Sequence, residues 1–368
     1  MSDIKVTVVP FEGSDYDAYV AKMARVSHSQ QPTQRSDSDL VRRLRSDPDA
    51  PHWTPSAHVQ FVYALEIHSE ITRNWLWKDI SEATGGDLFD ATCSSMVGDF
   101  SKIFIRVSLQ HLLNVIANKH KYLVLHDLLL SPHGAESTTS AAFEDIAQAG
   151  RAVLAEGGSA IIHRDECTWF DRLRALVTVL PAAYPACKNP FRDNSTASEL
   201  LKETFRMSPS LFTTTLLIEN IPLWMATQLL RHRRGVVVNQ QSFRYSSDVS
   251  QDAWKYEYKW RKQAKTKAAA GQAPLVDWSE LPMAFVHSHC DEAIHKLREA
   301  YKRALGAGVS RECARDLLPS FFPTNMYVTL TREALDRIIH LRGGQEAQAE
   351  WYPLVEQLRA VRDMGPTS

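Results

Sequence analysis

A cluster of positively charged side chains precedes an apolar stretch in the segment RHRRGVVVNQQSFRYS, residues 231–246. Arginine forms bidentate hydrogen bonds with phosphate and carboxylate groups, so the cluster predicts either a nucleic-acid contact or a site for an anionic small molecule. The chain of 368 residues has a formal net charge of −1. Because nucleic-acid binding usually requires a basic surface, this balance favours a local role for the charge. We expect a small-molecule site and no nucleic-acid partner.

The segment before the cluster, LWMATQLLRHR at 223–233, predicts a helix. On this helix Gln228, Arg231 and His232 stand at i, i+3 and i+4, so they would share one face. Polar side chains also share a face by chance on an exposed helix. The pattern alone therefore leaves two interpretations open, a ligand-binding face and a solvated one.

A later segment, TREALDRIIHLR, predicts a helix that places an arginine in line with an apolar stripe. Thr331 can cap this helix. The stripe has the spacing i, i+3, i+4 and i+7 and consists of Leu335, Ile338, Ile339 and Arg342. Burial of a guanidinium without an anion or hydrogen-bond acceptors is costly. Arg342 therefore either extends to water at the helix end or faces a ligand.

Two further arginines lie near predicted changes of chain direction. Arg244 follows the valines at 236–238 in a polar turn, and Arg315 precedes a short helix that Pro319 ends. A pair of guanidinium groups is suited to hold the phosphate of a small molecule. A surface position explains each arginine when it is taken singly.

Alternation of apolar and polar residues predicts strands at 4–8, 59–67, 212–219 and 236–238. Helices are expected after the cap Ser14, around 40–44, at 105–116, at 284–305 and after the cap Ser310. Residues 69–211 contain loop-like stretches and no visible repeat. We interpret 69–211 as an insertion between two parts of one domain, at 1–68 and 212–368.

The cellular setting is predicted from cysteine usage and hydropathy. The five cysteines are scattered without a C-x-x-C pair, which is typical of reduced thiols in a cytoplasmic protein. The first residues are too charged for a signal peptide, and no apolar run approaches the roughly 20 residues that span a bilayer. His287, His289 and Cys290 would diverge on a helix, so no metal site is predicted.

Several ordered motifs together resemble the flavin-dependent thymidylate synthase family. The order Arg-His-Arg, a short gap and Asn-x-x-Ser-x-Arg-Tyr-Ser is similar to the signature of that family. The resemblance covers about residues 1–68 and 212–360. It extends to the segments ARVSH (24–28), HWTPSAH (52–58), PLWMATQLLRHR (222–233), RECARDLLP (311–319), LTREALDRIIHLR (330–342) and AQAE (347–350).

The resemblance implies a fold and an assembly. The fold is an α/β (α+β) subunit with a central, mostly antiparallel sheet and long helices, elaborated here by the insertion at 69–211. The family usually forms homotetramers whose active sites lie at subunit interfaces and draw on several chains. A cytoplasmic homotetramer with shared active sites is therefore expected, without a membrane or nucleic-acid partner.

The resemblance also implies a reaction. The expected enzyme is a methyltransferase that moves a one-carbon unit from methylenetetrahydrofolate to C5 of a pyrimidine nucleotide, as in the conversion of dUMP to dTMP. FAD is the implied cofactor, and NADPH and methylenetetrahydrofolate are the implied co-substrates. The alternatives are the same chemistry on UMP or dCMP, with a methyl or hydroxymethyl product, and a non-catalytic binding protein.

Roles follow from the resemblance position by position. Arg342 would lie against the pyrimidine ring and stabilise the negative charge that develops on it during catalysis. The implied nucleotide-binding residues are Gln228, Gln240, Ser242, Arg244 and Arg315. The implied flavin-binding residues are His52, Thr54, Arg231, His232, Arg233 and Asn239.

This sequence departs from the family pattern near the implied ligands. One extra residue separates Arg233 from Ser242, which is most easily placed in the loop. A glutamine replaces a glutamate at Gln240, and a large residue replaces a small one at Phe243. Ala57 replaces another glutamate of the family, and flavin-facing residues of the family are replaced at Thr331, Glu333 and Glu346. These changes leave the identity of the pyrimidine and the mode of flavin binding open.

Overall fold

A computed structural model describes residues 4–9, 15–28, 36–46, 54–66, 102–117, 176–181, 213–244, 292–344, 347 and 351–363. Its centre is a four-stranded antiparallel sheet with the strand order β1-β5-β7-β6. These strands are β1 (Lys5–Val8), β5 (Thr213–Pro222), β6 (Val236–Gln240) and β7 (Pro323–Thr331). Three of them match strands predicted at 4–8, 212–219 and 236–238, whereas β7 was missed.

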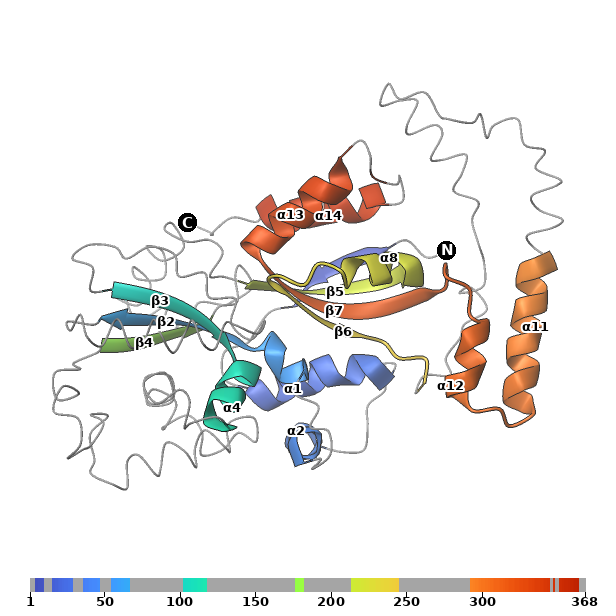
Figure 1. Cartoon of the computed structure of the whole chain (residues 1–368), viewed down its shortest axis with the longest axis horizontal. Coiled ribbons are helices and arrows are strands. Elements are labelled where there is room, and N and C mark those ends of the chain that lie inside the picture. Colours follow the sequence, from blue (N-terminus) through green and yellow to red (C-terminus); the bar gives the residue numbers. More distant parts are fainter. Residues whose placement is uncertain are drawn as a thin grey trace.

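A second, three-stranded antiparallel sheet has the order β3-β2-β4. It consists of β2 (Gln60–Glu66), β3 (Lys102–Ser108) and β4 (Leu176–Pro181). The strand predicted at 59–67 therefore pairs with strands from the segment interpreted as an insertion. In Figure 1 this sheet extends from one end of the four-stranded sheet. With their helices, the two antiparallel sheets confirm the predicted α+β class.

Helices cover both faces of the four-stranded sheet (Figure 1). One face carries α1 (Tyr16–Arg25) and α2 (Asp37–Ser46), with the short 3-10 helix η1 (Val26–His28). The other face carries α8 (Leu223–Leu229), α13 (Arg332–Gly343) and α14 (Tyr352–Asp363). Beyond one end lie α11 (Glu292–Gly306), α12 (Arg311–Ala314) and the 3-10 helix η11 (Arg315–Leu317).

The main apolar core lies between the four-stranded sheet and the helices α8, α13 and α14. Strand residues such as Leu216 and Val328, both fully buried, pack there with Ile338 of α13 and Leu354 of α14. Trp351, just before α14, is also completely buried in this core. The predicted apolar stripe of α13 is confirmed, because its residues at i, i+3 and i+4 are all buried.

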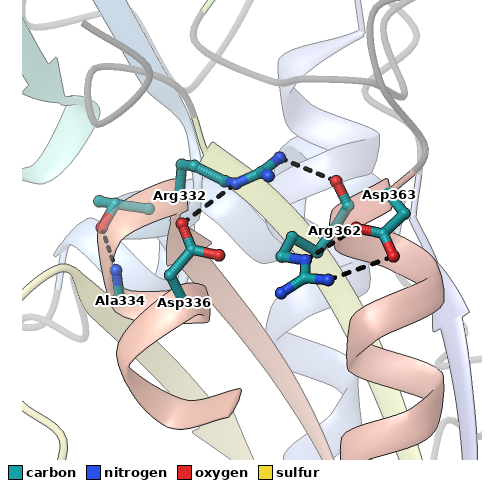
Figure 2. Close-up of polar contacts among 6 residues, drawn as sticks. Arg332, Ala334, Asp336, Arg362 and Asp363 are labelled. Carbon is teal, nitrogen blue, oxygen red and sulfur yellow. Dashed lines mark hydrogen bonds and ion pairs between the residues drawn. The ribbon is translucent and has the colours of Figure 1, made fainter. Parts of the chain in front are cut away.

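Polar contacts fix α13 and α14 relative to each other. Figure 2 shows that Arg332, at the start of α13, donates from its Nε to the carboxylate of Asp336. Its Nη1 donates to the carbonyl oxygen of Arg362 in α14 at 2.8 Å. Thr331 caps α13 as predicted, since its hydroxyl accepts from the Ala334 amide at 3.0 Å. These contacts determine where α13 carries Arg342.

Some local predictions need correction. The first helix is capped by Asp15, which accepts from the Ala18 amide at 2.9 Å, and not by Ser14. The helix predicted at 105–116 is a strand up to Ser108, and only α4 (Leu109–Ala117) is helical. The apolar residues of β3 pair with β2, a partner distant in sequence, and this pairing overrides the local helical spacing.

Other predictions hold in part. Of the helix expected at 284–305, residues 292–305 belong to α11, and the earlier part lies outside the described residues, as do His287, His289 and Cys290. Ser310 caps α12 as predicted, accepting from the Cys313 amide. Among the described residues, no helix is long and apolar enough to cross a membrane.

Candidate functional site

The arginine-rich motif lies in the turn between α8 and β6. The helix predicted over 223–233 ends earlier, at Leu229, so Arg231 and His232 lie beyond it. Their amides nevertheless donate to the carbonyl oxygens three residues back, Arg231 to Gln228 at 3.3 Å and His232 to Leu229 at 3.0 Å. Such tight turns are a common way to satisfy the last carbonyls of a helix. Gln228, Arg231 and His232 therefore remain within about one turn of each other.

Gly235 lets the chain turn from this motif into β6. Its φ is +69°, in the left-handed region that favours glycine. A Cβ at this position would lie 2.4 Å from the Thr331 hydroxyl oxygen, closer than two unbonded atoms approach. The Gly235 carbonyl oxygen accepts from the Thr331 amide at 2.9 Å. The absence of a side chain thus brings the motif directly against the start of α13.

The structure brings Arg342 to this motif. Burial lowers the pKa of His232, and the positive charges of Arg342 and Arg337 lower it further. Burial also lowers the pKa of Arg342, with a smaller effect from Arg231. Such mutual effects require proximity. Arg231 and Arg342, which lie in distant parts of the sequence, are therefore within electrostatic range of His232 or of each other, and the three residues are here named the motif cluster.

Arg342 stacks on an aromatic ring. Its guanidinium carbon lies 4.7 Å from the ring centroid of Trp351, the distance of a cation–π contact. The Arg342 Nε is buried and has no hydrogen-bond partner among the described residues. The side chain is half-buried. The sequence left two environments open for the Arg342 guanidinium, water or a ligand. The indole face of Trp351 is a third neighbour that was not predicted.

A second group of predicted residues lies at the other end of β6. Arg244 forms an ion pair of 2.9 Å with Glu312 in α12, three residues before Arg315. Arg315 is exposed, and its closest recorded carboxylate is that of the neighbouring Asp316, at 4.0 Å. The amide of Ser242 donates to the carbonyl oxygen of Ser27 at 3.3 Å. Ser242, Arg244 and Arg315 form the group that we call the β6-end cluster.

Within one chain the two clusters do not meet. The motif residues 231–233 precede β6, whereas Ser242 and Arg244 follow it. Five extended residues span about 16 Å. Arg342 therefore lies with the motif cluster, at the opposite end of the strand from Arg244. Arg342 and Arg244 are therefore not brought together within the described residues of one chain.

Several implied ligand-binding residues have internal contacts. Asn239 is buried, and its side-chain amide donates to the carbonyl oxygen of Met23 at 3.3 Å. Gln240 is half-buried, and its amide donates to the Thr324 hydroxyl at 3.5 Å. Phe243 packs edge-on against Phe322 at 5.3 Å between ring centroids. The large side chain at 243 is thus held in a small apolar cluster, while Ser242 and Arg244 on either side are less buried.

A cavity of about 360 Å³ lies between the two sheets, next to the motif. It contains two of the predicted flavin-binding residues, Thr54 and Arg233. Ala57 and Thr331, two of the positions that depart from the family pattern, also line it. The remaining lining residues are Gln60, Arg106, Ser108, Gln110, His111, Thr213, Gly235, Val236, Val237, Val238 and Thr329. His52 and Glu346 lie outside the described residues, and Glu333 on α13 is exposed.

The chemistry of the cavity fits part of a flavin nucleotide. Its volume falls within the range of roughly 300–1,000 Å³ that is usual for small-molecule sites. The walls combine apolar valines from β6 with hydroxyl, amide and guanidinium donors. Such a lining suits a ligand with a flat apolar part and oxygen-rich groups. Thr54 and Arg233 are the predicted residues that would hold it.

A buried polar chain supports the floor of this cavity. His58, at the end of the 3-10 helix η2 (Thr54–His58), lies with its Nδ1 2.7 Å from the Thr329 hydroxyl of β7. That hydroxyl lies 2.7 Å from the hydroxyl of Thr215 in β5. Burial lowers the pKa of His58 to about 3, although Asn239 opposes the shift. His58 is therefore neutral near pH 7 and connects η2 to the central strands.

The cavity residues contributed by β3 and α4 were not predicted from the sequence. Arg106 is 6% exposed in the strand segment KIFIRVS. A single arginine inside an apolar strand is a signal of a polar partner, because its burial is otherwise costly. That signal was hidden by the prediction of a helix at 105–116, in which Arg106 had no special position.

Comparisons with known proteins match parts of this sequence. The family model described as thymidylate synthase complementing protein matches residues 184–367, half of the chain. A flavin-dependent thymidylate synthase of Kosmotoga olearia is 32% identical over 130 residues, which cover 35% of this chain and 54% of that protein. Another from Thermus thermophilus is 29% identical over 177 residues, which cover 48% of this chain and 62% of that protein.

The matches leave part of each relative unaligned. The chain spans about half the length of the curated relatives it matches. A crystal structure of the UMP/dUMP methylase PolB from Streptomyces cacaoi with 5-Br UMP has 23% identity and a TM-score of 0.32. That match covers 46% of this chain and 79% of the other. The family match over residues 184–367 includes the arginine motif, both clusters and α13, and the chain belongs to the thymidylate synthase complementing protein family.

Proposed function

We propose that the protein transfers a one-carbon unit from methylenetetrahydrofolate to C5 of a pyrimidine nucleotide, with dUMP as the first candidate and dTMP as its product. FAD is the proposed cofactor and NADPH the proposed electron source. The observation that carries the proposal is the motif cluster, in which Arg342, stacked on Trp351, lies within electrostatic range of Arg231 and His232, next to a cavity lined by Thr54 and Arg233. Family membership and the names of the curated relatives support it.

The proposed reaction balances as a reductive methylation. A carbon–carbon bond forms at C5, the two bonds from the transferred carbon to the folate nitrogens break, and the C5 hydrogen leaves as a proton. Two electrons and a proton, drawn ultimately from NADPH, reduce the transferred carbon to a methyl group. A bound flavin would supply the means to carry those two electrons. Without this reduction, addition of water would give a hydroxymethyl product.

The proposed role of Arg342 is electrostatic. Negative charge develops on the pyrimidine ring as C5 becomes nucleophilic, and a fixed cation lowers the energy of that state. Arg342 is suited to this role because Trp351 holds its guanidinium by cation–π contact at 4.7 Å. The lowered pKa of His232 leaves that imidazole neutral near pH 7, so Arg342 keeps a neighbour that adds no positive charge there.

The β6-end cluster is the proposed phosphate site. Arg244 and Arg315 are both exposed, and arginine binds phosphate in a bidentate manner. The ion pair of Arg244 with Glu312 has side chains that are 44% and 52% exposed. Exposed pairs of this kind contribute about 0–1 kcal/mol, so Arg244 can exchange Glu312 for a phosphate at low cost.

UMP or dCMP remains an alternative acceptor. Gln240 replaces a family glutamate and donates to Thr324, so a carboxylate contact with the ligand is absent at this position. A change of a charged to a neutral contact alters which base or sugar is preferred. The same chemistry would then give a different C5-substituted nucleotide.

Release of tritium from C5 tests the proposal. Purified protein should carry a flavin that absorbs at about 450 nm. With methylenetetrahydrofolate and NADPH it should release tritium from at least one C5-labelled nucleotide among dUMP, UMP and dCMP. Arg342→Met should abolish release, whereas Arg303→Met on exposed α11 should not change it. Colourless protein that releases no tritium from any of the three nucleotides would refute the proposed enzyme and favour a binding protein.

A further inference from the structure

We propose that Arg106 binds a phosphate group of the flavin nucleotide in the cavity beside the motif, an inference that rests on the proposed function. Arg106 lies in β3, which precedes residues 184–367 of the family match. The segment from β3 into α4 nevertheless forms one wall of the cavity that Thr54 and Arg233 line. Residues outside the family match thus contribute to the site.

Arg106 is a built-in part of this wall. Only 6% of its surface is exposed, whereas Arg233 in the same cavity is an exposed residue. Ordering and burying a guanidinium is costly unless acceptors surround it. A cavity-lining position lets one polar group of the ligand be among those acceptors. Arg106 therefore contributes charge from the protein side and Arg233 from the solvent side.

The charge of the cavity favours an anion. Among its described lining residues, two carry guanidinium groups and none carries a carboxylate. Hydroxyl groups of Ser108 and Thr331 line the same space and can donate to phosphate oxygens. The first turn of α4 also lies at this wall, through Gln110 and His111, and its helix dipole adds partial positive charge.

The wall is attached to the rest of the site. The amide of Leu109, the first residue of α4, donates to the carbonyl oxygen of Val59 at 2.9 Å. Val59 directly follows η2, which carries Thr54. Arg106 is paired with Val62 in the neighbouring strand. These contacts set Arg106 relative to Thr54, so the second sheet positions the arginine.

This role predicts a specific pattern of flavin affinity. FAD contains a pyrophosphate, FMN one phosphate and riboflavin none. Removal of a charge-assisted contact typically weakens binding by about 10- to 100-fold. Arg106→Met should therefore raise the dissociation constant of FAD by that factor and change the riboflavin constant by less than about threefold. Arg106→Lys, which keeps the charge but loses the bidentate geometry, should give an intermediate loss for FAD.

The experiment is calorimetric titration of the full chain with FAD, riboflavin and inorganic pyrophosphate. Arg25→Met is the matched control, because Arg25 is also shielded, with a side chain 19% exposed, but lies in α1 outside the described cavity lining. The control should bind all three probes like the wild type. If Arg106→Met does not fold, Arg106→Lys and Ser108→Ala carry the test.

The outcomes separate this inference from the proposed function. Equal losses of FAD and riboflavin affinity in the Arg106 variants, or no loss of either, would overturn the phosphate contact. Wild-type protein that binds neither flavin would refute the proposed function. In that case, binding of pyrophosphate to the wild type but not to Arg106→Met still supports an anion site at Arg106. A wild-type protein that binds no pyrophosphate overturns the anion site as well.

Discussion

At the scale of single residues, Gly235 allows the contact between the arginine motif and α13. Its backbone has a φ of +69°, and its missing Cβ leaves room for the Thr331 side chain. Glycine is the residue that adopts this conformation without strain. The hydroxyl that would collide with a Cβ is the one that caps α13. One glycine thus serves both the turn and the helix start.

Gly235→Ala should lower the free energy of unfolding by about 2–4 kcal/mol, from left-handed strain and the clash with Thr331. Thr331→Ala should cost about 1 kcal/mol through loss of the helix cap. The loss of unfolding free energy in the double variant should be smaller than the sum of the two single losses, because Thr331→Ala removes the hydroxyl with which the added Cβ clashes. Urea unfolding measures all three. The control is Gly306→Ala, where a Cβ meets nothing within 4 Å. Equal free energies of unfolding for Gly235→Ala and Gly306→Ala would contradict the proposed strain and clash at Gly235.

Trp351 is a positioning residue for Arg342. Trp351→Phe keeps an aromatic face and Trp351→Leu removes it, and both should reduce stability because the indole is fully buried. Because Trp351→Leu loses the cation–π contact, its kcat for tritium release should be about tenfold lower than the kcat of Trp351→Phe. Urea unfolding confirms that both are folded under the assay conditions. Equal kcat values would show that the ring only fills space.

At the scale of elements, a buried hydrogen-bonded chain joins η2 to the central strands. His58 contacts Thr329 of β7, and Thr329 contacts Thr215 of β5. The pKa of His58 is lowered to about 3 by burial. The unfolded chain takes up a proton on His58 below its ordinary pKa of about 6.5, whereas the folded chain does so only near the lowered value. Its contribution to stability is complete above pH 6.5 and decreases as the pH falls towards 3.

This difference between 6.5 and about 3 predicts a pH-dependent loss on the order of 5 kcal/mol over that range, at about 1.4 kcal/mol per pH unit. His58→Asn should keep a polar contact to Thr329 and should remove this part of the pH dependence. The free energy of unfolding, measured in urea between pH 7 and pH 4, should therefore fall less steeply in the variant. His340→Asn changes an exposed histidine of α13 and should leave the wild-type slope unaltered. The same slope in His58→Asn as in the wild type would refute the assignment.

Local sequence signals predicted some elements well. The cap Thr331 and the stripe Leu335, Ile338 and Ile339 predicted α13, because both signals lie within the helix itself. Residues 105–108 of β3 were predicted as the start of a helix, because the pairing partner of this strand, β2, lies about 40 residues earlier. β7 was missed although Met326, Val328 and Leu330 alternate with polar residues. Pairing with a distant partner decided the β3 segment against its local spacing, whereas β7 carried an alternating pattern that was overlooked.

The site was predictable in its residue types and not in its arrangement. The motif residues Arg231 and His232 were identified from the sequence, and the structure places Arg342 beside them. The indole under Arg342 and the cavity wall at Arg106 depend on tertiary packing between distant segments. No spacing within one segment specifies such contacts. His52 lies outside the described residues, so its role stays a prediction.

At the scale of the whole molecule, the two clusters of arginines lie at opposite ends of β6. Arg342 belongs to the motif cluster, and Arg244 and Arg315 belong to the β6-end cluster. We propose that a homotetramer joins the motif cluster of one chain to the β6-end cluster of another. Symmetric oligomers bring different surfaces of identical chains together in this way. The active site would then be complete only in the assembly.

Mixing two inactive variants tests this claim most directly. Arg244→Ala and Arg342→Ala are purified separately, dissociated, mixed in equal amounts and reassembled, and tritium release from C5-labelled nucleotide is measured. If each site takes Arg244 from one chain and Arg342 from another, random reassembly should restore about a quarter of the wild-type rate. The separate variants, treated in the same way, should remain inactive. A mixture no more active than the separate variants, despite confirmed mixed assembly, would contradict the shared site.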